Sequence, residues 1–202
     1  ERVTQITDCA ATAKFSWTAD GRYLAFGCGD GMIRFWDAAS GQVSRTLPGP
    51  QDMSFVAVSP DDKTLAVISG GDRVLLLDSV SGAVKQTLRT PVGHLTNLKF
   101  SPDSRKLATC NSDLAGSGRD NRVWDLAAGE EGSLDLMIGA NASAYDFSSD
   151  SRQILIADHK GMIHIWDLER RTEIDRFWAH AGSARSVQWL PDGRVLSSGD
   201  DG

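Results

Sequence analysis

The chain has 202 residues, of which 41% are hydrophobic and 24% are charged, a composition typical of a soluble globular domain. Its formal net charge is -6, which argues against a nucleic-acid-binding surface because such a surface needs clustered Lys and Arg. No segment approaches the roughly 18 apolar residues of a membrane span. We therefore expect a cytoplasmic protein without nucleic-acid or membrane partners.

The chain repeats one unit from its beginning to its end. In each unit an alternating apolar run leads into a polar turn such as Ser59-Pro60-Asp61, and this order predicts a strand and a hairpin turn. The spacing between turns is about 41 to 47 residues, a period typical of stacked four-stranded units. The turn aspartates are Asp20, Asp61, Asp103, Asp150 and Asp192.

Three further strands are predicted after each of the first four turns, and only the second strand after the fifth. The second strand opens with an apolar residue four positions past the aspartate, and these residues are Leu24, Leu65, Leu107, Ile154 and Leu196. The third strand ends in Trp or Leu followed by Asp, at residues 36–37, 77–78, 124–125 and 166–167. The fourth strand follows after a glycine turn, as in residues 42–47.

These motifs resemble the WD-repeat β-propeller family, and the Ser-Pro-Asp turns are similar to those of its bacterial members. The resemblance implies an all-β fold of radial four-stranded antiparallel blades around a central channel. We expect four full blades at residues 8–49, 50–90, 91–138 and 139–178, and a partial fifth at 179–202. Residues 1–7 are predicted to be an outer strand. We interpret the chain as part of a larger propeller; closure by pairing with a second copy is the alternative.

A buried hydrogen-bond chain is also implied by the resemblance. Two units carry a histidine before their first strand, and only those two have a hydroxyl six residues past the turn aspartate. In the family such a His, a Ser or Thr, an Asp and the Trp bond across one blade. The predicted members are His94, Thr109 and Trp124, with Asp113 or Asp120, in the third unit, and His180, Ser198 and Asp200 or Asp201 in the fifth.

A catalytic role for these residues is the competing interpretation. Ser198, His180 and Asp200 have the residue types of a nucleophilic triad, but triads are recognised by geometry and roles rather than by residue types. The hydrogen-bond chain explains both units at once, so we expect no catalytic residues. His159 and His164 stand apart and do not form a metal site, and no cofactor is expected.

The three cysteines are Cys9, Cys28 and Cys110. They are widely separated, odd in number and not in a metal-ligand spacing. We expect them to be buried, reduced thiols in a cytoplasmic protein.

The residues predicted to face the channel lie between the two apolar positions of each first strand. Lys99 and Asp146 hold this position in neighbouring units. We predict an ion pair between the two blades rather than a ligand site, because an unpaired buried charge is costly.

The third unit has five extra residues between its second and third strands, within the Gly- and Ser-rich segment 111–121. Loops on rigid scaffolds often carry function. Trp178 has no position in the repeat, while its neighbour Phe177 takes the buried place that Leu47 holds in the first unit. The candidate partner-binding residues are Asp113, Leu114, Arg119 and Trp178.

These features predict a non-catalytic protein–protein interaction scaffold that presents loops on one propeller face. A channel-site enzyme or small-ligand sensor is one alternative, because a fold does not determine a function. A regulatory repeat array attached to an effector such as a kinase is another. The expected partners are proteins, including a second copy of the chain through the partial blade.

Overall fold

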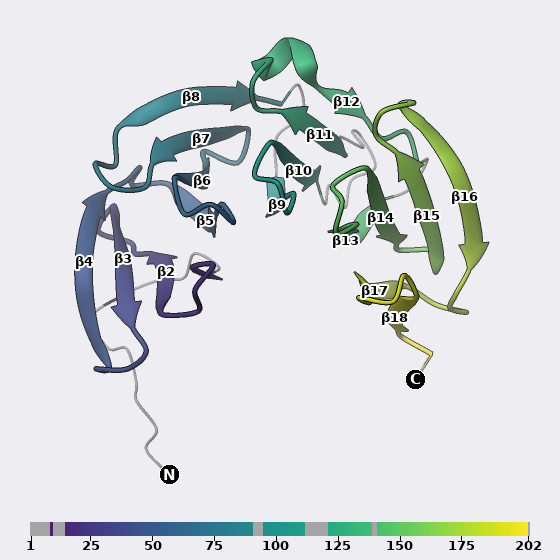
Figure 1. Ribbon diagram of the computed structural model, residues 1–202, viewed down its shortest axis with the longest axis horizontal. Coiled ribbons are helices and arrows are strands. Elements are labelled where there is room, and N and C mark those ends of the chain that lie inside the picture. Colours follow the sequence, from purple (N-terminus) through teal and green to yellow (C-terminus); the bar gives the residue numbers. More distant parts are fainter. Residues whose placement is uncertain (1–8, 10–14, 91–94, 112–120, 139–140, 202) are drawn as a thin grey trace. The chain divides into compact units, whose positions relative to one another are not determined.

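The computed structural model describes residue 9 and residues 15–90, 95–111, 121–138 and 141–201. Within these ranges the strands form four four-stranded antiparallel sheets and one two-stranded sheet, each with its strands in chain order (Figure 1). These sheets are the predicted propeller blades, four of them full and the fifth partial. Within the described residues, no helix has the length and apolar character needed to cross a membrane.

The chain divides into two compact units, residues 1–98 and 99–202, which are described separately. The first unit holds the first two blades. Their strands are β1 (Ser16–Trp17), β2 (Tyr23–Gly27), β3 (Met32–Asp37) and β4 (Gln42–Pro48), then β5 (Met53–Val58), β6 (Thr64–Ser69), β7 (Arg73–Asp78) and β8 (Val84–Arg89).

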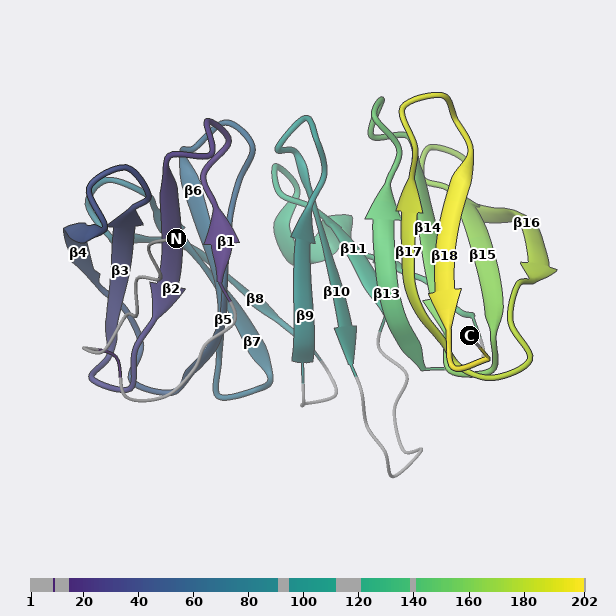
Figure 2. The same ribbon diagram turned by 90° about the horizontal axis from the view of Figure 1, so that it is seen from below.

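The third blade begins with β9 (Leu95–Phe100) and continues with β10 (Lys106–Asn111), β11 (Arg122–Asp125) and β12 (Leu134–Asp135). A 3-10 helix, η1 (Gly129–Gly132), lies between β11 and β12 and was not predicted. The fourth blade consists of β13 (Ala142–Phe147), β14 (Gln153–Asp158), β15 (Met162–Asp167) and β16 (Thr172–Trp178). The fifth sheet pairs β17 (Ala184–Trp189) with β18 (Val195–Gly199), which run antiparallel (Figure 2).

A side chain closes the first turn of each full blade. Ser59 Oγ donates to Asp61 Oδ1 at 2.6 Å and accepts the backbone N–H of Thr64 at 2.9 Å. Thr18, Ser101 and Ser148 make the same pair of bonds. Because turn length determines the register of a hairpin, this repeated turn places the same positions opposite each other in all four blades.

The fifth turn is one residue shorter than the others. The backbone N–H of Leu190 donates to the carbonyl of Arg194, four residues ahead, whereas that of Ser101 donates to the carbonyl of Lys106, five residues ahead. Leu190 also has no hydroxyl with which to close the longer turn. The strand after this turn is therefore shifted by one position relative to the other blades.

This shift corrects one sequence expectation. Trp189 pairs with Val195 across the fifth hairpin, in the way that Phe147 pairs with Ile154 in the fourth. Val195, and not Leu196, therefore holds the position in its second strand that Ile154 holds in the fourth blade. Leu196 is 55% exposed.

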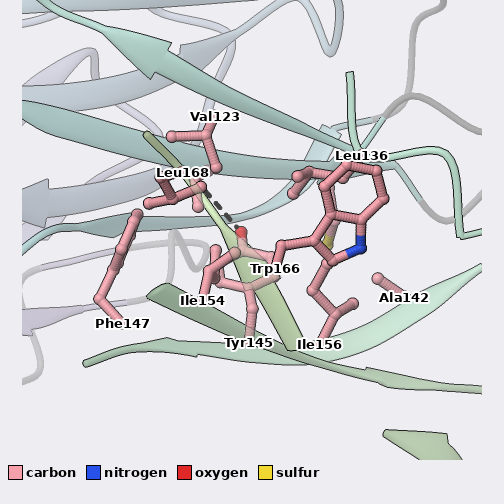
Figure 3. Close-up of a cluster of buried hydrophobic side chains, with 11 residues drawn as sticks. Val123, Leu136, Ala142, Tyr145, Phe147, Ile154, Ile156, Trp166 and Leu168 are labelled. Atoms are coloured by element: carbon pink, nitrogen blue, oxygen red, sulfur yellow. Dashed lines mark hydrogen bonds between the residues drawn. The ribbon is translucent and has the colours of Figure 1, made fainter. Parts of the chain in front are cut away.

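Apolar layers hold neighbouring blades together within each unit. In the first unit the layer joins β2, β3 and β4 to the second blade, and its members include Phe35, Leu47, Val56, Leu65 and Leu77. In the second unit the layer between the third and fourth blades contains Val123, Leu136, Tyr145, Phe147, Ile154, Ile156, Trp166 and Leu168 (Figure 3). The Tyr145 hydroxyl donates to the Ala108 carbonyl at 3.4 Å, which satisfies the one polar atom of that side chain.

The cysteine expectation was wrong for two of the three residues. Cys9 and Cys28 form a disulfide, while Cys110 is buried and not part of a disulfide. Cys28 directly follows β2, so the disulfide ties the end of β2 to Cys9, which precedes β1 in the sequence. Spacing along the sequence gives no sign of this proximity.

Asp150, in the first turn of the fourth blade, is expected to make a pH-dependent contribution to stability. The Ser148 hydroxyl, and then the Arg152 backbone N–H, lower the pKa of Asp150 below its ordinary value of 3.8. The folded state therefore binds fewer protons than the unfolded state, so this contribution to stability is complete above pH 3.8 and is lost as the pH falls through the folded pKa.

Ser148→Ala removes the principal cause of this shift. We expect the variant to be less stable than the wild type at neutral pH, and the difference to shrink in acid below pH 3.8. Urea unfolding at neutral pH and near pH 3 measures it, with the exposed neighbour Ser149→Ala as control. A difference that does not change with pH would contradict the assignment.

Candidate interaction face

The structure brings Lys99 and Asp146 together. Lys99 Nζ lies 2.5 Å from Asp146 Oδ1, and Asp146 Oδ2 accepts the backbone N–H of Trp189 at 2.7 Å. Between the first and second blades, Ser16 holds the position equivalent to Asp146, and its Oγ accepts the backbone N–H of Val58. Asp146 therefore links the first strands of successive blades, and both of its oxygens are already used.

The hydrogen-bond chain predicted for the fifth blade needs a correction in two residues. His180 Nε2 lies 3.0 Å from Ser197 Oγ, and His180 Nδ1 lies 2.7 Å from Asp201 Oδ1. Ser198 is exposed, and Asp200 instead accepts two hydrogen bonds from Arg185. The short fifth turn explains the difference in the hydroxyl, because it moves Ser197 into the place expected for Ser198.

In the third blade the hydroxyl equivalent to that of Ser197 belongs to Thr109, and it bonds to a tryptophan. Thr109 Oγ1 accepts the indole N–H of Trp124 at 3.0 Å, and both side chains are buried. Thr109 lies two residues after Leu107, which faces Trp124, just as Ser197 lies two residues after Val195. Ser197 therefore holds on β18 the position that Thr109 holds on β10.

His164 has partners that the sequence did not reveal. Its Nδ1 lies 2.6 Å from Glu173 Oε1, and its Nε2 lies 3.3 Å from Asp158 Oδ2. His164 is buried, and it joins β15 both to the end of β14 and to β16. No cluster of three or more His, Cys, Asp or Glu among the described residues is arranged to hold a metal ion.

Several predicted positions lie outside the described residues. These are His94, Asp113, Leu114, Arg119, Asp120 and residues 1–7. The roles assigned to them from the sequence stay predictions.

Trp178, the last residue of β16, is 65% exposed. Its partner across the ladder is Met162 on β15. A hollow of about 420 Å³ opens beside it, lined by Trp178, Ala179, His180 and Ala181. We call these four residues the Trp178 face.

The backbone of the Trp178 face is anchored to two other segments. The N–H groups of Ala179 and His180 both donate to the carbonyl of Gly161, at 3.0 and 3.1 Å. Asp201 Oδ2 accepts the N–H of Ala181 at 2.8 Å, and this bond, followed by that to His180, lowers the pKa of Asp201. The exposed indole is thus carried by a connection with little freedom to move.

Phe177 differs from its sequence expectation. It was predicted to be buried like Leu47, which is 7% exposed, but it is 40% exposed. Leu47 shares its apolar layer with Leu77, a third-strand residue of the next blade. The described part of the fifth sheet has no third strand, so nothing equivalent to Leu77 covers Phe177.

Comparisons with known proteins agree with this architecture. The family model of the anaphase-promoting complex subunit 4 WD40 domain matches residues 2–58, and the WD domain, G-beta repeat model matches residues 85–125 and 171–202. The crystal structure of the Myceliophteria thermophila Cps50 (Swd1) β-propeller domain superposes with a TM-score of 0.79 at 20% identity, over 97% of this chain and 64% of that one. This likeness shows the fold.

Curated relatives are matched at low identity. Autophagy-related protein 16 of Arabidopsis thaliana is 25% identical over 174 residues, which cover 85% of this chain and 33% of that protein. Target of rapamycin complex subunit wat1 of Schizosaccharomyces pombe is 30% identical over 151 residues, 69% of this chain and 43% of that protein. The chain thus spans less than half the length of these two relatives. Its repeat motifs, its blades and these matches together show that the chain belongs to the WD-repeat β-propeller family.

Proposed function

We propose that this chain is a non-catalytic protein-interaction platform whose contact surface is the Trp178 face. The main support for this proposal is that Trp178 is 65% exposed while the backbone next to it is held by hydrogen bonds. Tryptophan is enriched at the centres of protein interfaces. A contact residue held in place before binding also loses less conformational entropy when the partner arrives. We extend the proposal to Asp113, Leu114 and Arg119 as further contacts.

The polar groups near the face support binding rather than catalysis. His180 is engaged by Ser197 and Asp201, and the channel carboxylate of Asp146 is occupied by Lys99 and Trp189. Two matches are described by their names as complex subunits, one of the target of rapamycin complex and one of the anaphase-promoting complex. A partner in a multiprotein assembly is the corresponding proposal for this chain.

The disulfide changes the inference about location. We expected reduced thiols in a cytoplasmic protein, whereas Cys9 and Cys28 are joined. Disulfides persist mainly in oxidising compartments and are rare in the cytosol. The disulfide does not fit the cytoplasmic location, which therefore stays a proposal.

Trp178→Ala tests the platform. The tagged chain is expressed in its native cells, and copurifying proteins are quantified for wild type, Trp178→Ala and the exposed control Val80→Ala. We expect the tryptophan variant to retain at most about one tenth of a specific partner, since a central aromatic contributes 2 kcal/mol or more. Equal recovery with all three proteins would overturn the assignment of this face.

A further inference from the structure

The disulfide joins two points that belong to different segments of the first blade. Cys28 directly follows β2, and Cys9 lies before β1 in the sequence. The sheet of this blade does not depend on the disulfide, because backbone ladders pair β1 with β2, β2 with β3 and β3 with β4. The disulfide therefore fastens a segment onto a blade whose strands are already held together.

The second blade makes the same link with a hydrogen bond. Ser69 lies four residues after Leu65, just as Cys28 lies four residues after Leu24, so Ser69 and Cys28 hold equivalent positions. The Ser69 hydroxyl donates to Asp52 Oδ1 at 2.7 Å, and Asp52 directly precedes β5. A hydrogen bond thus suffices to fasten the end of a second strand to the segment before the first strand.

The fourth and fifth sheets make the link through the backbone. The His159 N–H donates to the Asn141 carbonyl at 3.1 Å, and the Asp200 N–H donates to the Ser183 carbonyl at 3.0 Å. In both pairs the donor directly follows the second strand of its sheet, and the acceptor directly precedes the first strand. Hydrogen bonds do not respond to a thiol reductant, whereas a disulfide does. The link in the first blade is thus redox-active at a place where the second, fourth and fifth sheets use hydrogen bonds.

The disulfide is attached to the turn between β2 and β3, residues 28–31. The Gly31 N–H donates to the Cys28 carbonyl at 3.0 Å, and the Gly31 carbonyl accepts the N–H of Gly49, in the connection to the second blade, at 2.8 Å. In the fourth blade the carbonyl of Gly161 holds the connection that carries the Trp178 face in the same way. The disulfide therefore acts at the end of the first blade that corresponds to the Trp178 face of the fourth.

The two sulfurs differ in their access to solvent. Cys28 is 2% exposed, whereas Cys9 is half-buried, so an external thiolate reaches Cys9 Sγ first. Attack there by the thiolate of a glutathione-type thiol forms a mixed disulfide with Cys9, breaks the Cys9–Cys28 bond and releases Cys28 as a thiolate, which takes a proton from water. A second thiolate attacks the non-protein sulfur of the mixed disulfide and releases Cys9, which is protonated in turn. Two external thiols are oxidised to one disulfide, and both cysteines are reduced.

We propose that the Cys9–Cys28 disulfide is a redox-responsive clasp. Oxidation fastens the chain at Cys9 to the β2–β3 turn, and reduction releases it while the ladders of the first blade stay paired. The clasp thereby places one end of the first blade under the control of the surrounding thiol–disulfide balance. It requires neither Trp178 nor a bound partner, so this proposal and the interaction platform can fail independently.

Thiol counting in two glutathione buffers tests the clasp. The 202-residue protein is equilibrated at the redox poise of a cytosol and at that of the endoplasmic reticulum, and its free thiols are trapped and counted by mass spectrometry. We expect Cys9 and Cys28 to be free in the first buffer and joined in the second. In the reduced, folded protein Cys9 should be alkylated at least about tenfold faster than Cys28, because a buried thiol reacts only after local opening. A disulfide that persists in both buffers, or is absent from both, would overturn the proposal.

Hydrogen exchange measures whether the release is local. Reduction is expected to speed the exchange of residues 28–31 at least about tenfold and to leave residues 69–72 unchanged, because Ser69 is held by a hydrogen bond instead. Cys9→Ser should reproduce the reduced wild type in both buffers, while the control Cys110→Ser should keep the wild-type response. Unchanged exchange at residues 28–31 would make the disulfide a passive crosslink, and faster exchange throughout both blades would show that it holds the fold. Either result would overturn the clasp.

Discussion

Gly161→Ala is expected to lower the free energy of unfolding by more than about 3 kcal/mol. A Cβ at Gly161 would overlap the backbone carbonyl oxygens of His180 and Gly182, which cannot turn aside as a side chain can. The same Gly161 carbonyl holds the N–H groups of Ala179 and His180. Relief of the overlap would therefore require the connection that carries Trp178 to move.

Gly193→Ala is the matched control. Gly193 has φ +83°, close to the +94° of Gly161, but a Cβ there would meet no atom within 4 Å. Its cost is limited to the left-handed backbone, about 1 to 2 kcal/mol. Urea unfolding of both variants separates crowding from backbone strain. Similar losses would show that the connection adjusts freely and that Trp178 is not rigidly presented.

Trp124→Phe is expected to cost about 2 to 4 kcal/mol. The change leaves a cavity at a fully buried position and removes the N–H donor to Thr109, which is also buried. Adding Thr109→Val to Trp124→Phe should cost less than the sum of the single changes, because both remove the same bond. Strict additivity would contradict the bond.

Trp166→Phe, in the fourth blade, is the comparison for Trp124→Phe. Trp166 Nε1 is buried and has no hydrogen-bond partner among the residues that the structure describes. Ile156 holds the place that Thr109 has in the third blade. We expect this variant to lose at least about 1 kcal/mol less than Trp124→Phe, since no bond is broken and an unsatisfied donor is removed. Equal losses in thermal or urea unfolding would disprove the role of the hydroxyl.

The repeat pattern was sufficient to predict the blades. Apolar alternation, a polar turn and a Trp-Asp or Leu-Asp ending recur at one period, and each of these signals is local, so it can be read without knowing the fold. Identical positions in successive repeats also face each other across neighbouring blades. For that reason the sequence could predict the contact of Lys99 with Asp146, while the contact of Thr109 with Trp124, within one blade, was implied by the family resemblance.

The remaining features depend on contacts that no local pattern encodes. Counting residues from Asp192 led to Ser198, but a turn shorter by one residue brings Ser197 to His180. The partners of His164 come from two neighbouring strands, and the cysteines of the disulfide come together only when β1 and β2 pair. Hydrogen bonds and disulfides require atoms within a few ångströms, and one residue of register reverses the face on which a strand side chain lies.

The burial of Phe177 and Leu47 shows most clearly the difference between what the repeat determines and what blade packing determines. Phe177 and Leu47 occupy equivalent positions in their repeats, so the sequence predicts the same environment for both. Whether such a residue is covered depends on the next sheet, which supplies Leu77 over Leu47 and has no described third strand over Phe177. The repeat determined the strands and their order and, in the four full blades, the side of the sheet on which their side chains lie. The packing of one blade on another determined which apolar groups are shielded from water, because burial is a property of neighbouring surfaces rather than of a single residue.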